Sequence, residues 1–187
     1  MAGPEKEKLE IISSEQIYHG RVFDVTVATI REDDQTYKRE IVNHPGSAVI
    51  IPVFDNGTVA LVEQYRHPAR RFMLEVPAGT LSPGEPPEDG ARRELEEEVG
   101  VRAGQMEKLS EFFVSPGFLE EKMWLYLATK LTETKQSLDD DEYLKIRRIP
   151  LLRAMQMITD GEIEDAKTII GIMLTAQRLG IGTTGES

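Results

Sequence analysis

Residues 79–101 read GTLSPGEPPEDGARRELEEEVGV, and they place carboxylates where a helix disfavours them. The stretch predicts a helix that ends at Gly100, because glycine is the usual residue just past a helix C-terminus. Glu94, Glu97 and Glu98 then stand at i, i+3 and i+4, so they are neighbours on one helix face. Like charges at this spacing destabilise a helix, and the dipole of its last turn favours cations. Such a conflict indicates a functional site, since divalent cations would relieve the repulsion.

Acidic runs are most often solvated helix faces, and that interpretation fits residues 94–98 taken alone. The wider spacing argues for a site instead. The chain matches every fixed position of the pattern G-x5-E-x7-R-E-U-x-E-E-x-G-U, where U is aliphatic: Gly79, Glu85, Arg93, Glu94, Leu95, Glu97, Glu98, Gly100 and Val101. The segment therefore resembles the Nudix box, the motif of the Nudix hydrolase superfamily.

The residue types in this motif suit metal and phosphate chemistry. Gly79 can allow the backbone to approach a metal or phosphate closely. The guanidinium of Arg93 is a fixed fork of donors that can tie Glu85 to a helix carboxylate. Glu94 and Glu98, one turn apart, offer the hard oxygen ligands that Mg2+ or Mn2+ prefers. Two such ions bridging a diphosphate would neutralise it, orient it and provide hydroxide near neutral pH.

Composition narrows the classes of protein that the chain can be. Its 187 residues are 40% hydrophobic and 29% charged, which is ordinary for one globular domain. The net charge of −11 argues against a nucleic-acid partner, because phosphate backbones need clustered Lys and Arg. No apolar run reaches transmembrane length, so no membrane partner is expected. The chain has no cysteine, which predicts a cytoplasmic location.

Apolar periodicity and turn residues divide the chain into strands and helices. Strands are predicted within residues 9–42, at 47–54, 58–65, 72–76, 107–114, 123–128 and 144–149, and helices at 87–100, 150–158 and 165–179. The strands at 47–54 and 58–65 are predicted to form a hairpin, because Asn56-Gly57 between them is a strong turn signal. Strands and helices in this mixed order predict an α/β (α+β) fold.

The Nudix resemblance makes that fold more specific. It implies an αβα sandwich around a mixed β-sheet, with an N-terminal antiparallel strand arm. Residues 1–45 would be the arm and residues 46–187 the Nudix hydrolase domain. The arm resembles one that related enzymes exchange between subunits, which implies a homodimer with composite sites.

Further segments resemble the ADP-ribose pyrophosphatase branch of the superfamily. They are Lys38-Arg39-Glu40, Glu63-Gln64-Tyr65-Arg66, Leu74-Glu75-Val76-Pro77-Ala78-Gly79, Ser115-Pro116-Gly117-Phe118 and Asp165-Ala166-Lys167-Thr168. The resemblance implies Mg2+-dependent hydrolysis of ADP-ribose to AMP and ribose 5-phosphate, with Mn2+ as the other candidate ion. ADP-glucose or GDP-mannose is the alternative substrate. A ligand-sensing module without catalysis is the alternative class, but such proteins usually lose box carboxylates and here all are present.

The resemblance assigns the metal and the general base to particular residues. Glu94 and Glu98 would be the main metal ligands, with the backbone carbonyl of Ala78 beside them. Glu97 would bind a further ion or be oriented through Arg93. Two candidates remain for the base that activates water. Glu142, in the acidic loop 138–142, holds the position of a catalytic glutamate in this branch, whereas Glu97 could act from the helix.

Substrate contacts are carried over from several segments: Arg66, Arg39, Tyr18, Phe23, Pro116, Gly117 and Glu121. Arg66 would bind the diphosphate, and its alternative is a surface salt bridge. Arg39, Tyr18 and Phe23 would hold adenine, although the two aromatic residues could equally pack in a core. Pro116 and Gly117 belong to the turn typical of this branch. Glu121, after the turn, would touch the distal ribose or a metal ion.

Overall fold

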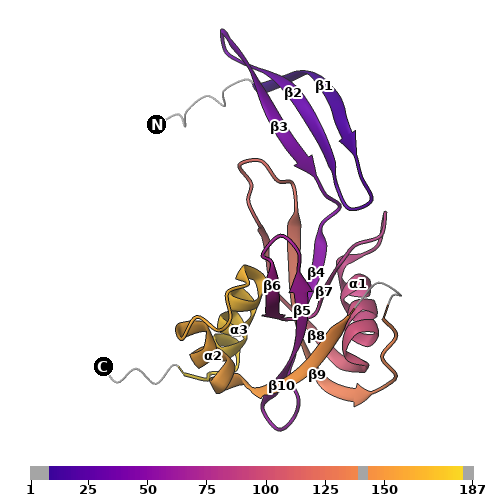
Figure 1. Ribbon diagram of the computed structural model, residues 1–187, viewed down its shortest axis with the longest axis vertical. Helices are drawn as coiled ribbons and strands as arrows, with labels where there is room; N and C mark the ends of the chain where they lie inside the picture. The colour runs from indigo at the N-terminus through magenta and orange to yellow at the C-terminus, as the bar shows by residue number, and fades with distance from the viewer. Residues whose placement is uncertain (1–8, 139–142, 183–187) are drawn as a thin grey trace, which may run out of the picture. The chain divides into compact units, whose positions relative to one another are not determined.

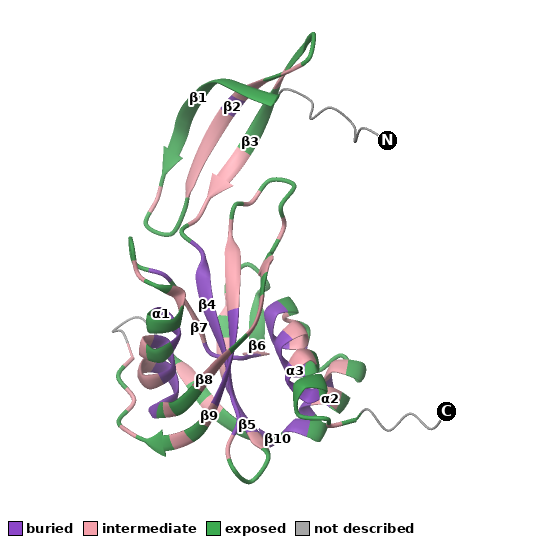
Figure 2. Ribbon diagram, turned by 180° about the vertical axis from the view of Figure 1, so that it is seen from behind, coloured by how far each residue is buried: buried purple, intermediate pink, exposed green. Residues whose placement is uncertain are grey.

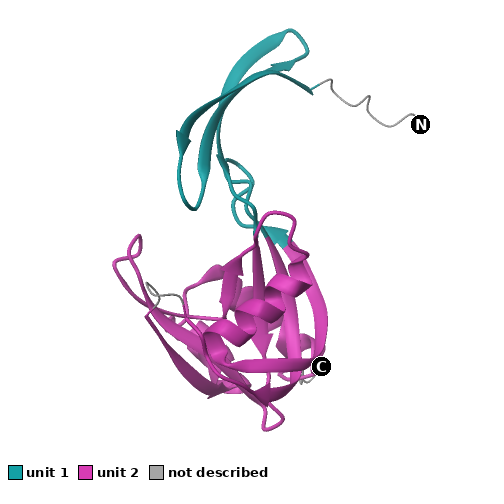
Figure 3. Ribbon diagram, turned by 90° about the vertical axis from the view of Figure 1, so that its right-hand side faces the viewer, with its two compact units in different colours: residues 1–46, 112–122 teal, residues 47–111, 123–187 magenta. Residues whose placement is uncertain are grey.

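The structure is a computed structural model that describes residues 9–138 and 143–182, and the chain forms two compact units (Figure 3). Unit 1 comprises residues 1–46 and 112–122, and unit 2 comprises residues 47–111 and 123–187. The domain boundary after residue 45 stays a prediction, because unit 1 also includes residues from the middle of the chain. Within the described ranges, every helix is too short or too polar to cross a membrane.

Unit 1 is a three-stranded antiparallel sheet in the order β1-β2-β3. The strands are β1 (Leu9–His19), β2 (Asp24–Glu32) and β3 (Gln35–Asn43). The segment 112–122 joins through Val42, which donates to the Phe118 carbonyl at 2.8 Å and accepts from the Glu120 N–H at 2.9 Å. Ala28 is the only buried residue between residues 9 and 43, all of which are described, so these strands have almost no core of their own.

Unit 2 contains two further sheets. The antiparallel sheet has the order β10-β5-β6 and consists of β10 (Leu144–Pro150), β5 (Thr58–Arg66) and β6 (Arg71–Glu75). The mixed sheet has the order β7-β4-β9-β8 and consists of β7 (Ala78–Thr80), β4 (Ser47–Pro52), β9 (Lys122–Glu133) and β8 (Val101–Phe113). Strand β4 runs parallel to β9 and antiparallel to β7.

The predicted hairpin between β4 and β5 is wrong beyond its turn. The turn itself forms, since the Phe54 N–H donates to the Thr58 carbonyl at 2.9 Å and Val53 bridges Val59. The two strands then diverge into different sheets. All six residues of β4 are buried and both of its edges are already paired, so β5 has no edge of β4 to join.

Helices cover both faces of β4 (Figure 1). The helices are α1 (Pro87–Glu94), the single π-helical turn η1 (Leu95–Val99), α2 (Leu151–Thr159) and α3 (Ala166–Arg178). Ile50 packs in a buried cluster with Ala91 and Leu95, whereas Ile51 contacts Gly171 of α3. Successive strand side chains point to opposite faces, so α1 and α3 lie on opposite sides of β4. The predicted αβα sandwich is confirmed, and Figure 2 shows its buried residues gathered on β4 and β5.

The helix of the motif begins and ends as predicted, but its last turn is π-helical. Pro87 is its first residue, and Gly100 follows it with φ of 70°, in the left-handed region. The residues after β9 satisfy carbonyls of the last turn. Gln136 Nε2 donates to the Glu98 carbonyl at 2.6 Å, and the Ser137 N–H donates to the Glu97 carbonyl at 3.0 Å. A π-turn is rare and frequently marks a functional site.

We predict that Gly100→Ala destabilises the protein more than Gly57→Ala. Both glycines have positive φ, and a side chain in that conformation costs about 1 kcal/mol. A Cβ at Gly57 would meet nothing within 4 Å, whereas one at Gly100 would lie 2.9 Å from the backbone N of Gln136. The contact should cost roughly 1–3 kcal/mol more. Equal free energies of unfolding by urea denaturation would contradict this account.

Candidate active site

One guanidinium joins three of the carboxylates that the motif singled out. Arg93 donates to both oxygens of Glu85, from Nε to Oε1 at 2.9 Å and from Nη2 to Oε2 at 3.0 Å. Its Nη1 donates to Oε1 of Glu94 at 2.6 Å and to Oε2 of Glu97 at 2.9 Å. The loop before the helix and the helix itself are therefore held by the same side chain. The positive charge of Arg93 therefore offsets part of the negative charge of this helix face, since one guanidinium is shared by three carboxylates.

The hydrogen bonds between Arg93 and Glu85 favour the ionised form of the glutamate. Hydrogen bonds from Arg93 and from the Ser82 N–H lower the pKa of Glu85 below its ordinary value of 4.5. The hydrogen bonds to Glu85 in turn raise the pKa of Arg93, and those to Glu94 and Glu97 add to the effect. Arg93 and Glu85 therefore both stay charged throughout the neutral range.

Glu94 and Glu98 converge on the backbone of residues 78 and 79. Both are buried, with 9% and 4% of their surface exposed. Oε2 of Glu98 accepts a hydrogen bond from the Ala78 N–H at 3.1 Å. A Cβ built on Gly79 would lie 1.9 Å from Cδ of Glu94, so only glycine allows this close approach. Two buried carboxylates therefore border the same short segment of chain, and glutamate is seldom buried unless it is paired.

The donor set fits a hard divalent cation, because carboxylate and carbonyl oxygens are the ligands that such ions prefer. Within residues 9–138 and 143–182, no group of three or more His, Cys, Asp or Glu side chains is already gathered as a metal site. The same carboxylates accept hydrogen bonds within the protein, because Arg93 donates to Glu94 and Glu97 while Ala78 donates to Glu98.

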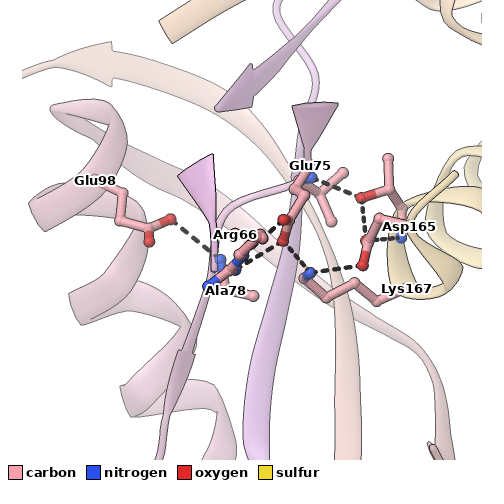
Figure 4. A network of polar contacts seen from close by, with 8 residues as sticks. Arg66, Glu75, Ala78, Glu98, Asp165 and Lys167 are labelled. Atoms are coloured by element: carbon pink, nitrogen blue, oxygen red, sulfur yellow. Dashed lines mark hydrogen bonds and ion pairs between the residues drawn. The ribbon is translucent and has the colours of Figure 1, made fainter. Parts of the chain in front are cut away.

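Arg66 is held by a buried glutamate to which the sequence analysis gave no role (Figure 4). Its Nε and Nη2 donate to Oε1 and Oε2 of Glu75, each at 2.7 Å. Lys167 also donates to Oε2 of Glu75, and it donates to Oδ1 of Asp165 at 2.9 Å. The signal that could have revealed this network is the presence of Glu75 within an otherwise apolar run, residues 72–78.

Other predicted substrate residues lie in unit 1. Arg39, Pro116 and Gly117 line one cavity of about 440 Å³. The rings of Tyr18 and Phe23 are 5.7 Å apart between centroids, and both are exposed, so packing in a core is wrong for them.

The two remaining acidic predictions are Glu121 and Glu142. Glu121 is largely buried in unit 1, with Oε1 3.9 Å from Nδ1 of His44. Glu142 lies outside the described residues.

Comparison with known proteins supplies the class of this αβα protein. The NUDIX domain family matches residues 44–170. The ADP-ribose pyrophosphatase of Bacillus subtilis (strain 168) is 40% identical over 164 residues, which cover 86% of this chain and 89% of the relative. The methanol dehydrogenase activator of Bacillus methanolicus is 42% identical over 164 residues, which cover 86% of this chain and 89% of that relative. A GDP-mannose pyrophosphatase of Yersinia enterocolitica is 34% identical over 134 residues, 67% of this chain and 70% of the relative.

A solved structure supports the fold independently. The crystal structure of an ADP compounds hydrolase superposes with a TM-score of 0.83, covering 95% of this chain and 97% of that one at 23% identity. The chain therefore belongs to the Nudix family. It is a Nudix hydrolase, as the spacing of its glutamates predicted.

We predict that Glu85→Gln lowers the free energy of unfolding at pH 7 but has little effect on it in strong acid. The folded pKa of Glu85 is depressed, so its contribution is present above the unfolded value of about 4.5 and is lost as pH falls through the folded pKa. At pH 7 the variant should be about 1–3 kcal/mol less stable, because charge-assisted hydrogen bonds are lost. Urea denaturation from pH 3 to 7 measures both proteins. A difference that does not shrink in acid would refute the role of the ionised carboxylate.

Proposed function

We propose that the protein hydrolyses the diphosphate of ADP-ribose to AMP and ribose 5-phosphate, with Mg2+ or Mn2+ as cofactor. The observation that carries this proposal is the convergence of buried Glu94 and Glu98 on the chain at Gly79, beside a helix braced by Arg93. The 40% identical relative, an ADP-ribose pyrophosphatase, supports the choice of substrate. The lack of cysteine supports a cytoplasmic enzyme.

The proposed metal ligands are Glu94, Glu97 and Glu98, with the carbonyl of Ala78. When bound there, a divalent cation supplies positive charge for the diphosphate and lowers the pKa of a bound water. The protein's own part is to hold the ligands still. Arg93 fixes the rotamers of Glu94 and Glu97 through its Nη1 hydrogen bonds.

The residues proposed to bind the other parts of the substrate are chosen by their charge and shape. Arg66 would grip the diphosphate, for which a planar guanidinium is well suited. Arg39, Pro116 and Gly117 are candidates for the nucleoside, because their shared cavity has the size of small-molecule sites. Tyr18 and Phe23 offer exposed rings for stacking on adenine. Glu121 would contact the distal ribose or a metal ion.

Two glutamates are candidates for the general base. Glu97 has 41% of its side chain exposed, so water can reach it. Its Oε2 already accepts a hydrogen bond from Arg93. Glu142 is the candidate from the acidic loop. Glu142→Gln should lower kcat far more than it changes metal affinity if Glu142 is the base, and Glu97→Gln should do so if Glu97 is.

The alternative substrate is another nucleotide sugar. A GDP-mannose pyrophosphatase is among the relatives. The motif residues would bind only the diphosphate and the metal ion, so they leave the sugar and the base of the substrate undetermined. A sensing module without catalysis is disfavoured, because all the box carboxylates are present and braced.

The test is release of AMP from ADP-ribose with Mg2+, compared with release of nucleotide from ADP-glucose and GDP-mannose. We expect the highest kcat/KM for ADP-ribose and loss of turnover on adding EDTA. Faster hydrolysis of GDP-mannose would support the alternative substrate. Absence of hydrolysis of all three compounds would support the sensing module.

Matched variants locate the chemistry on the helix. Glu98→Gln should reduce kcat by a factor on the order of 1,000 or more, because it removes a charged metal ligand. Glu96→Gln is the control, since Glu96 belongs to the same turn but pairs with Arg102 on the exposed side. It should retain near-normal activity. Full activity of folded Glu98→Gln would exclude the proposed mechanism.

We further predict a homodimer held by the N-terminal arm. Strand β1 and the connection between β1 and β2 expose large apolar side chains: Leu9, Ile11, Ile12, Ile17, Tyr18, Val22 and Phe23. Exposed apolar side chains in this number support an interface with a second subunit. Light scattering at micromolar concentration should give twice the chain mass of 21.1 kDa. Ile11→Glu should weaken the dimer, and a monomer in the unaltered protein would contradict the prediction.

A further inference from the structure

A buried, charge-balanced network lies behind Arg66 (Figure 4). Glu75, at its centre, is 1% exposed and accepts from both Arg66 and Lys167. Lys167 is 8% exposed and also donates to Asp165. Two cations and two carboxylates therefore share one region. Lysine is rarely buried unless paired, so its presence there requires a reason.

Both carboxylates of this network depend on Lys167. Burial by itself would raise the pKa of Glu75, but the hydrogen bonds from Arg66 and the charge of Lys167 outweigh it, so the pKa is lowered. Without Lys167, Arg66 alone would compensate Glu75, and Asp165 would lose its ion-pair partner. The network would change from neutral to a net charge of −1, immediately beside the side chain that is proposed to bind an anion.

The N-terminus of α3 also positions residues 75–78, and the backbone of Ala78 contacts Glu98, a proposed metal ligand. Asp165 caps α3 by accepting from the Thr168 N–H at 2.9 Å and from its hydroxyl at 2.6 Å. The hydroxyl oxygen of Thr168 accepts from the Val76 N–H at 2.8 Å. Two residues further on, the Ala78 N–H donates to Glu98. The start of α3 therefore positions β6 and the following turn through both a charge and a hydroxyl group.

Arg66 itself is partly open. Its side chain is 41% exposed, whereas that of Glu75 is 2% exposed, so the guanidinium covers the glutamate and faces outward. Among the described residues, Nη1 of Arg66 has no hydrogen-bond partner. Its pKa is raised mainly by the hydrogen bonds to Glu75, with contributions from the charges of Asp165 and Glu98. The partly exposed guanidinium, whose Nη1 is not bonded to Glu75, is suitably placed for an anionic ligand.

We propose that Lys167 is a positioning residue for diphosphate binding: by sharing Glu75, it keeps the guanidinium of Arg66 in place and its charge available to the substrate. The inference rests on the proposed function, and it assigns Lys167 no contact with the substrate. It accounts for a buried lysine where an apolar residue would pack at lower desolvation cost.

The test is a double-mutant cycle on Arg66 and Lys167. Lys167→Met should raise KM for ADP-ribose by about tenfold and lower kcat much less, because it weakens binding of the anion. In an Arg66→Ala background the same change should alter KM by less than about twofold, since no guanidinium remains to be positioned. Equal effects in both backgrounds would mean that Lys167 acts independently of Arg66, and would overturn the inference.

Two controls separate this role from stability and net charge. Arg153→Met removes one positive charge from an exposed pairing with Asp160 and Glu162, and it should leave KM unchanged. Lys167→Gln keeps a hydrogen-bond donor for Glu75 but removes the charge, so it serves where Lys167→Met does not fold. It should raise KM in the same direction, and an unchanged KM in the folded variant would refute the charge argument.

Calorimetry distinguishes failure of this inference from failure of the proposed function. ADP-ribose is titrated into wild-type and Lys167→Gln protein in EDTA, where hydrolysis is not expected. Weaker binding in the variant supports the inference even if the enzyme prefers another substrate. Equal binding overturns it even if the wild type releases AMP rapidly. Absence of AMP release by the wild type counts against the proposed function alone.

Discussion

The sharing of Arg93 among Glu85, Glu94 and Glu97 is the interaction on which the rest of the site depends. A helix with acidic residues in its last turns works against its own dipole, and burial of Glu94 adds a desolvation cost. One guanidinium offsets both effects with charge-assisted hydrogen bonds. It also joins the loop after β7 to the helix, so the positions of the carboxylates and the path of the chain are fixed together.

The opposite edge of the site uses the same physical logic with the charges reversed. Glu75 holds the cation Arg66, and Lys167 in turn compensates Glu75. In each case a charged group that is proposed to bind a ligand is held by a partner of opposite sign. The two braces come from different helices, α1 and α3, which pack on opposite faces of β4. The layered fold therefore brings an acidic and a basic side chain to one short stretch around residues 75–79.

Local features of the chain were predictable because their causes are local. Pro87 and Gly100 limit the helix by their own backbone preferences, and the spacing of Glu85 from Arg93 allowed their contact to be expected. The hairpin of β4 and β5 failed for the complementary reason. Its Asn-Gly turn forms locally, but pairing depends on β7 and β9, which are distant in sequence and occupy both edges of β4.

The amino-acid sequence alone was sufficient for the family, the helix limits and the acidic motif, since each is encoded in residues a few positions apart. Tertiary structure decided which charged groups pair when the two partners are far apart in the sequence. The contact of Glu75 with Lys167 spans 92 residues, and no periodicity or motif spacing encodes such a distance. The π-helical turn is likewise stabilised by Gln136 and Ser137, far along the chain. Hydrogen bonds between distant segments exist only once the layers have packed, which is why these features required the fold.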